Sequence, residues 1–119
     1  YDAVLIKDNH IKAAGGIIKA VEKIKKNYNN SMQIEVETTT LSEVNDAIIA
    51  KSDIIMLDNM SLEDIKKAVN LIDGRASTEV SGSISLDQLN SLSKVNIDFV
   101  SIGALTHSPK SSDISMNFL

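Results

Sequence analysis

The sequence contains no cysteine, which excludes disulfide bonds, thiolate catalysis and cysteine-based zinc sites. Its two histidines, His10 and His107, lie far apart in the chain, so a histidine-rich metal site is not expected. Arginine occurs once, at Arg75, although planar anions are usually gripped by arginine forks. No apolar run approaches the roughly 20 residues that span a bilayer. These shortages argue against redox, zinc-thiolate and membrane-spanning proteins.

The composition that remains is ordinary for a soluble globular protein, with 43% hydrophobic and 24% charged residues. A length of 119 residues allows one domain at most. Acidic residues outnumber basic ones by 16 to 12, which argues against a nucleic-acid binder, because such a protein needs a basic face. The chain starts at Tyr1 with a strand already under way, so we expect it to be a piece of a longer sequence.

Apolar runs of strand length alternate with segments of helical spacing. The predicted strands cover 3–6, 34–36, 53–57, 76–80 and 98–102. The predicted helices carry apolar stripes over 17–24, 41–49, 62–72 and 86–92. Capping boxes at Thr40–Glu43 and Ser85–Gln88, and a cap at Ser61, mark three of the helix starts. Gly15 and Gly16 are expected at the start of the first helix.

Four successive strand–helix–strand units predict an α/β fold with parallel pairing and right-handed crossovers. Strands this uniformly apolar are expected to be covered on both faces. Two architectures fit, an open doubly wound sheet or part of a parallel (β/α) barrel. Five strands in 119 residues give about 24 residues per strand–helix unit, which is close to the unit length of a (β/α) barrel. A full barrel of this kind needs about 250 residues. We therefore expect about the C-terminal half of a barrel, whose first and last strands would be open edges.

In both architectures ligands gather at the carboxyl ends of the strands. Polar residues or glycine stand at every one of these ends. They are Lys7, Asp8 and His10, then Glu35 and Glu37, then Asp58 and Asn59, then Ser81–Ser83, then Gly103. Glu37, Asp58, Ser81 and Gly103 follow one another at intervals of 21, 23 and 22 residues. They therefore occupy equivalent places in successive units.

Each of these features also has a purely structural interpretation. Lys7 and Asp8 at a strand end are more often a solvated turn than ligands. Glu35 and Glu37 alternate with apolar neighbours, so both point to one face, where an acid is costly unless it is used. Asp58 could simply cap the next helix.

The later candidates are open in the same way. Ser81–Ser83 could be a mere turn, yet small residues before a helix also make a phosphate nest. Gly103 could serve only close packing. His107 and the lysines of 23–26 are interpreted as surface residues. The residues by themselves predict a phosphate-binding barrel half with acids near the anion site. Such acids would hold sugar hydroxyls, a metal ion or a cationic transition state.

An ordered series of motifs then adds a resemblance. The motifs are LIKDNH at 5–10, IEVE at 34–37, IMLDN at 55–59, EVSG at 79–82, SIGALT at 101–106 and DISM at 113–116. In this order the chain resembles, over essentially its whole length, the quinolinate phosphoribosyltransferases. These enzymes are also called nicotinate-nucleotide pyrophosphorylases (carboxylating).

The resemblance implies a pentosyl-type glycosyltransferase reaction of de novo NAD synthesis. Quinolinate and 5-phosphoribosyl 1-pyrophosphate, with Mg²⁺, give nicotinate mononucleotide, pyrophosphate and carbon dioxide. By similarity, Glu37 and Asp58 stabilise the oxocarbenium-like transition state, and Lys7 lies on anionic groups of a substrate. The resemblance implies a phosphate cradle of main-chain amides at Ser81, Gly82, Ser83, Ile102, Gly103 and Ala104. Supporting positions behind the site are Asp8, His10, Glu35 and Asn59. No residue is assigned directly to the metal, since Mg²⁺ would be held mainly by substrate oxygens and water.

Two departures from the family pattern matter. Ser83 stands where the family usually has a second glycine, and we expect its hydroxyl to donate to the phosphate. The amino-terminal sandwich domain and first barrel strands, which carry the family's clamp for the two carboxylates of quinolinate, are absent from residues 1–119. Arg75 precedes a strand, on the opposite rim, and cannot replace that clamp.

The resemblance thus implies a cytoplasmic homodimer or higher oligomer, without nucleic acid or membrane, that is active only when the rest of the enzyme completes it. We expect the isolated chain to be inactive, and oligomeric or unstable. Two alternatives stay open: a non-catalytic remnant that binds phosphoribosyl ligands, and a paralogue with another acceptor, such as those associated with molybdenum transport.

Overall fold

The computed structural model describes residues 3–102 and 114–117, which form strands and helices in regular alternation. The elements are β1 (Ala3–Ile6), α1 (Asp8–Ala14), α2 (Ile17–Tyr28), β2 (Gln33–Thr38), α3 (Leu41–Ile49), β3 (Ile54–Asp58), α4 (Leu62–Ile72), β4 (Ser77–Gly82), α5 (Leu86–Leu92), β5 (Phe99–Ile102) and β6 (Ile114–Asn117). All five predicted strands and all four predicted helices are present.

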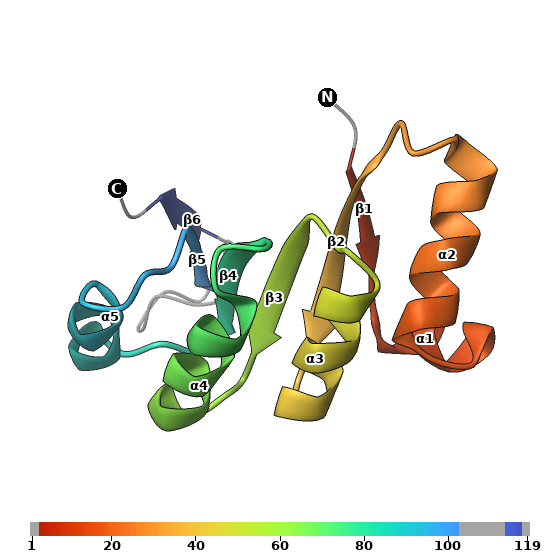
Figure 1. Ribbon diagram of the computed structural model, residues 1–119. Helices are drawn as coiled ribbons and strands as arrows, with labels where there is room; N and C mark the ends of the chain where they lie inside the picture. The colour runs from red at the N-terminus through yellow and green to blue at the C-terminus, as the bar shows by residue number, and fades with distance from the viewer. Residues whose placement is uncertain (1–2, 103–113, 118–119) are drawn as a thin grey trace.

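The strands form one sheet in chain order, β1-β2-β3-β4-β5-β6 (Figure 1). The pairs from β1 to β5 are parallel, as predicted. β6 was not predicted, and it pairs antiparallel to β5; an antiparallel neighbour needs no helical crossover, so the strand–helix rhythm does not reveal it. The expectation of an open edge at the last parallel strand is therefore wrong, because β6 covers β5.

α1 was not predicted either, since residues 7–10 were interpreted as the loop after the first strand. The helix buries Ile11 and carries an ion pair between Asp8 and Lys12 at 3.2 Å. It ends at Gly15, whose φ of 88° is left-handed and whose N–H bonds back to the carbonyls of Ile11 and Lys12. Gly16 then precedes α2, as expected. A seven-residue helix carries too few apolar positions for its period to stand out from sequence.

The starts of α3, α4 and α5 carry the predicted caps, but of the two predicted capping boxes only that of α5 is complete. Ser85 and Gln88 form a full capping box at α5, with bonds of 3.1 and 2.9 Å. Thr40 caps α3 by accepting from the Glu43 N–H at 3.1 Å. The Glu43 carboxylate reaches the N–H of Thr39 rather than that of Thr40. These local bonds satisfy amides that a helix start leaves unpaired.

Two aspartates tie neighbouring strands together at their starts. The Asp53 carboxylate accepts from the Ile34 N–H at 2.7 Å, and that of Asp98 accepts from the Thr78 N–H at 2.8 Å. Both residues were predicted to be the first residue of a strand. The structure places each one residue before it, where the side chain satisfies a backbone donor of the preceding strand.

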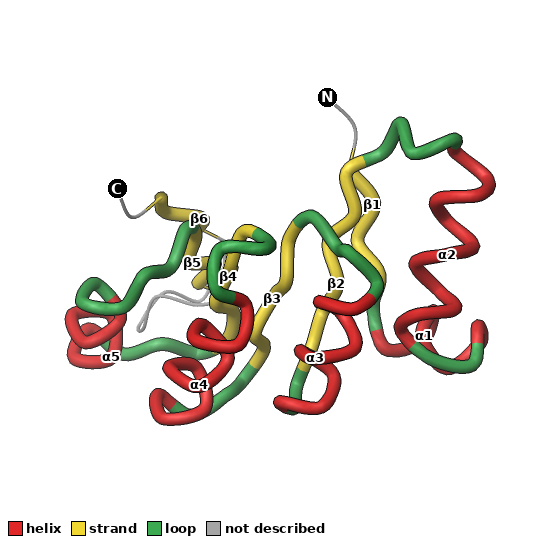
Figure 2. The backbone as a smooth tube through the Cα atoms, in the orientation of Figure 1, coloured by secondary structure: helices red, strands yellow, loops and turns green. Residues whose placement is uncertain are grey.

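The helices lie along one face of the curved sheet (Figures 1 and 2). Side chains that alternate along the strands, such as Val36, Leu57 and Val80, meet the helices in a core that is nearly inaccessible to solvent. The opposite set of side chains lies on what we call the inner face of the sheet. It includes Leu5, Glu35, Glu37, Met56, Asp58, Glu79, Ser81 and Ser101, which the strand register places together. Among the described residues only one face is thus covered by helices, as the wall of a (β/α) barrel requires.

Candidate functional site

The structure brings the sequence-predicted acids to one rim of the sheet. Glu37 is registered with Met56, two residues before Asp58 on the same face of β3. Asp58 is registered in turn with Ser81. Lys7 follows directly after β1, beside the end of β2. The rim therefore gathers Lys7, Glu37, Asp58 and Ser81 from four successive strands, as predicted.

Electrostatics show how closely these groups interact. Burial raises the pKa of Glu37, and the negative charges of Asp58, Asp8 and Glu43 raise it further. The ammonium group of Lys7 lowers the same pKa. Lys7 thus favours the ionised form of Glu37, whereas burial and the neighbouring acids favour its protonated form. A rim of this kind can face a centre that becomes positively charged during a reaction.

Asp8 and His10 have structural contacts at the start of α1. Asp8 pairs with Lys12 and adds to the negative field at Glu37. The imidazole Nδ1 of His10 accepts from the Lys7 N–H at 3.4 Å. The same ring lines a cavity of about 250 Å³ between β1, α1 and α2. This contact of His10 closes the first turn of α1.

Glu35 lies on the inner face two residues before Glu37 on β2. It interacts with Glu79, an acid that the sequence analysis did not single out. Burial, a hydrogen bond with the Glu79 carboxyl and the charges of Glu79 and Glu37 raise the pKa of Glu35 to about 8. One carboxyl oxygen of Glu35 is buried without a hydrogen-bond partner. Glu79 also accepts a 2.6 Å bond from the Ser101 hydroxyl. Alternation along β4 could have revealed Glu79, since it shares a face with Ser81.

The predicted phosphate turn, 81–83, begins with the last two residues of β4 and leads to the cap of α5. Gly82 has a φ of 134°, which disfavours any residue with a side chain. The Asn59 N–H donates to the Ser81 carbonyl at 3.0 Å, so the first residue after β3 is joined to the end of β4. Ser83 is exposed, and Ile102 is the buried last residue of β5. Gly103, Ala104 and His107 lie outside the described residues.

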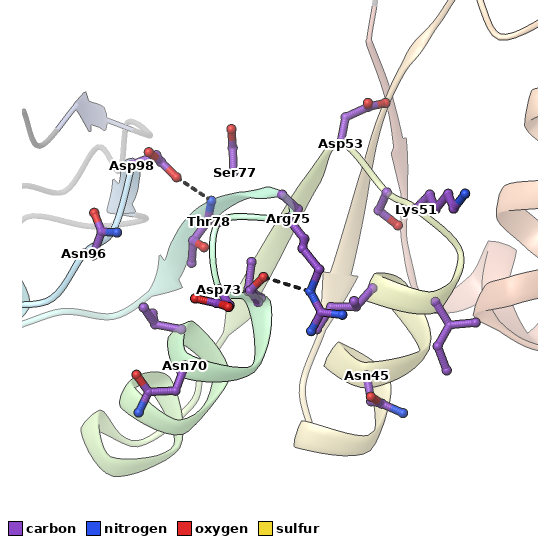
Figure 3. A pocket seen from close by; sticks show the side chains of 17 residues that line it. Asn45, Lys51, Asp53, Asn70, Asp73, Arg75, Ser77, Thr78, Asn96 and Asp98 are labelled. Carbon is purple, nitrogen blue, oxygen red and sulfur yellow. Dashed lines mark hydrogen bonds between the residues drawn. The ribbon is translucent and has the colours of Figure 1, made fainter.

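A groove of about 990 Å³ lies at the other end of the strands (Figure 3). Of its five charged residues, Asp53, Arg75 and Asp98 use their side chains in structural bonds. Arg75 donates to the carbonyls of Leu71 and Ile72 at the end of α4, while Asp53 and Asp98 hold strand amides. Arg75 thus lies on the rim opposite the acids, as predicted. We assign the candidate site to the carboxyl ends of the strands, where the groups without such structural roles gather.

The described part of the chain contains no group of three or more histidines or acids placed to hold a metal ion. Within the same residues, none of the helices combines the length and the apolarity that a bilayer crossing requires. Glu37 and Asp58 supply oxygen donors of the kind that Mg²⁺ prefers, in number too small for a cage made by the protein alone.

Comparisons with known proteins identify the family to which the chain belongs. Residues 1–117 match the family model described as quinolinate phosphoribosyl transferase, C-terminal domain. The "Probable nicotinate-nucleotide pyrophosphorylase (carboxylating)" of Methanocaldococcus jannaschii is 42% identical over 125 residues, covering 99% of this chain and 44% of that protein. The chloroplastic enzyme of the same name from Arabidopsis thaliana is 44% identical over 134 residues, covering 98% and 38%.

A solved structure gives the same picture in three dimensions. The nicotinate-nucleotide pyrophosphorylase from Francisella tularensis superimposes with a TM-score of 0.82 at 47% identity, covering 98% of this chain and 42% of that one. The chain thus spans about two-fifths of the length of these relatives, whose names favour an enzyme over a binding remnant. With the family model matched almost from end to end, the chain belongs to the quinolinate phosphoribosyl transferase family and corresponds to its C-terminal domain.

Proposed function

We propose that the chain supplies the ribose and phosphate side of the active site of a quinolinate phosphoribosyltransferase (decarboxylating). The reaction joins quinolinate to 5-phosphoribosyl 1-pyrophosphate and yields nicotinate mononucleotide, pyrophosphate and carbon dioxide. The observation that carries the proposal is the rim where Glu37 and Asp58 stand beside the 81–83 turn. It occurs in a chain whose family membership predicts this chemistry.

The two acids act on the sugar. The ring nitrogen of quinolinate attacks the anomeric carbon while the bond from that carbon to the pyrophosphate oxygen breaks. Positive charge develops on the ribose, and the carboxylates of Glu37 and Asp58 stabilise it and orient the hydroxyls. Lys7 favours the ionised form of Glu37 and attracts the anionic substrates. The carboxyl group next to the ring nitrogen then leaves as carbon dioxide, and a proton takes its place.

The phosphate of the ribose would lie against main-chain amides. Ser81 and Gly82 are the last two residues of β4, Ser83 begins the segment that leads to α5, and Ile102 ends the neighbouring strand. We assign Gly103 and Ala104 to the same cradle by resemblance. We assign to the Ser83 hydroxyl an additional donor, which the family's usual glycine lacks.

The proposal includes a Mg²⁺ ion bound to the pyrophosphate group of the donor. When bound, it would neutralise charge on the leaving group. The described residues offer Glu37 and Asp58 as nearby oxygen donors and no larger cluster, which fits an ion held mainly by substrate oxygens and water.

The dicarboxylate clamp must come from outside this sequence. Arg75, the single arginine, serves the opposite rim. We therefore propose that the chain works together with an amino-terminal sandwich domain and the first barrel strands, in a cytoplasmic homodimer or higher oligomer. A barrel completed in this way would cover the inner face, where the acids stand.

The test is an assay of the complete protein that carries this chain. Carbon dioxide released from carboxyl-labelled quinolinate, in step with formation of nicotinate mononucleotide, would support the proposal. Turnover of another aromatic acid in place of quinolinate would indicate a paralogue with a different acceptor. Binding of 5-phosphoribosyl 1-pyrophosphate without any product would contradict the enzymatic assignment. Sedimentation and cell fractionation test the oligomer and its location.

A further inference from the structure

The loop after β3 meets the end of β4 at one pair of residues, Asn59 and Gly82. Asn59 follows Asp58, the proposed ribose-side acid, and Gly82 is the centre of the proposed phosphate turn. A backbone bond of 3.0 Å runs from the Asn59 N–H to the carbonyl of Ser81. Asn59 is thus the link between the two halves of the proposed site.

The side chain of Asn59 adds a second contact. A β-carbon built on Gly82 would lie 2.6 Å from the Asn59 Oδ1, closer than real β-carbons approach another atom. The amide oxygen therefore lies in the space next to the Gly82 Cα–H, in the direction of a weak Cα–H···O contact. No residue other than glycine fits opposite Asn59 in this arrangement.

The backbone of both residues is also unusual. Asn59 has a φ of 52° and Gly82 a φ of 134°. Asparagine tolerates the left-handed region better than most residues, whereas the region of Gly82 strongly favours glycine. Two such residues in contact make a stiff junction, because neither can relax without losing the fit to the other.

The rest of the chain supplies matched comparisons. Gly16 has a φ of 131°, almost that of Gly82, yet nothing lies within 4 Å of a β-carbon built there. Asn29 has a φ of 50°, almost that of Asn59, and ends α2 at a distance in sequence from any proposed site residue. The chain thus contains both backbone conformations without the Asn–Gly contact.

We propose that Asn59 is a positioning residue that holds the 81–83 turn at a set distance from Asp58, and so matches the site to a phosphorylated ribose. This rests on the proposed function and extends it. Asn59 acts through Ser81 and Gly82, without touching the reacting atoms. Removal of its side chain should therefore weaken binding of the phosphoribosyl donor and leave binding of quinolinate nearly unchanged.

The first experiment uses Asn59→Gly in the complete protein. Glycine keeps the left-handed backbone and removes only the side chain. We expect the KM for 5-phosphoribosyl 1-pyrophosphate to rise roughly tenfold and that for quinolinate to change less than about twofold. The melting temperature should shift no more than that of the control Asn29→Gly. An unchanged donor KM, or an equal rise in both KM values, would overturn the proposal.

The second experiment tests the contact itself through Gly82→Ala and Gly16→Ala. Both substitutions strain a similar φ, but only Gly82→Ala also meets the Asn59 oxygen. We expect Gly82→Ala to lower the melting temperature more than Gly16→Ala, and the excess to disappear when Asn59→Gly is combined with it. An excess that persists in the double variant would contradict the contact.

Failure of the proposed function is separable from failure of this inference. If the wild-type protein makes no product, calorimetric affinity for 5-phosphoribosyl 1-pyrophosphate replaces the kinetic readout in the same variants. Equal affinities of the wild-type protein and of Asn59→Gly for the donor would overturn the role of Asn59, whether or not the protein forms product. A donor affinity lost on Asn59→Gly supports that role even where catalysis fails.

Discussion

Glu35 and Glu79 share a hydrogen bond between their carboxyl groups on the inner face, although they belong to β2 and β4 with β3 between them. Two carboxyl groups can be joined in this way only while one of them carries a proton. The raised pKa of Glu35, about 8, assigns that proton to Glu35 at neutral pH. Glu79 is then the acceptor for both Glu35 and the Ser101 hydroxyl.

The first prediction concerns Glu35→Gln and the pH dependence of stability. The folded chain holds a proton on Glu35 up to about pH 8, while the unfolded chain releases it near pH 4.5. The folded state therefore loses stability as the pH rises from about 4.5 to 8. Glutamine keeps an N–H donor toward Glu79 and carries no charge. We expect Glu35→Gln to raise the free energy of unfolding at pH 8 by about 1 to 2 kcal/mol, allowing for solvent screening.

Urea unfolding at pH 5 and pH 8 measures this effect. Glu22→Gln, on the exposed side of α2, is the matched control and should leave the pH dependence as it is. Equal pH slopes for wild-type and Glu35→Gln protein would mean that Glu35 ionises normally in the folded chain.

The second prediction concerns Asp58→Asn in the complete protein. The substitution preserves size and removes the charge that would stabilise the ribose cation. We expect kcat to fall by roughly two to three orders of magnitude with little change in the melting temperature. Because the charge of Asp58 also raises the pKa of Glu37, the acidic limb of the pH–rate profile should move to lower pH in the residual activity.

Steady-state kinetics over a pH series check both parts of that expectation. Asp64→Asn, at a half-buried acid in the first turn of α4, is the control for loss of one charge near the same loop. Turnover close to wild type in Asp58→Asn would remove Asp58 from the proposed mechanism.

The third prediction concerns the aspartates at the strand starts. Asp53→Ala leaves the Ile34 N–H without its 2.7 Å partner, and Asp98→Ala does the same to Thr78. Each should lower the free energy of unfolding by about 1 to 3 kcal/mol. Asp53→Asn keeps an acceptor oxygen and should recover most of the loss, as denaturant unfolding would measure. If Asp53→Asn were as unstable as Asp53→Ala, the negative charge of Asp53 and not its acceptor oxygen would be what stabilises the fold.

The fourth prediction concerns Ser83, which stands where the family usually has glycine. If its hydroxyl donates to the phosphate, Ser83→Ala and Ser83→Gly should each raise the donor KM by roughly three- to tenfold. The comparison of alanine with glycine separates the hydroxyl from the β-carbon. A lower KM in Ser83→Gly would instead indicate that the side chain narrows the phosphate turn.

Much of the fold could be predicted because it depends on local information. Alternating apolar runs revealed the five parallel strands, and Ser85 with Gln88 marked the start of α5 within a few residues of sequence. The similar spacing of Glu37, Asp58 and Ser81 placed them on one rim, since each unit of the fold repeats the same geometry. Arg75, before a strand, was assigned correctly to the other rim.

The short elements escaped prediction for a physical reason. α1 is one helix of seven residues, and β6 is an antiparallel strand that follows no crossover. Neither leaves a period long enough to be distinguished from a loop. The roles of Asp53 and Asp98 were missed as well, because a side chain that caps a neighbouring strand looks the same in sequence as the first residue of its own strand.

The sequence by itself determined the strand–helix order, the rim on which the acids gather and the family to which the chain belongs. The tertiary structure alone decided that Glu35 meets Glu79, 44 residues away, and that Asn59 lies against Gly82. Such pairs depend on the register between strands and on the exact path of two loops. Register is set by the packing of the whole sheet against its helices, so no local pattern of residues contains it.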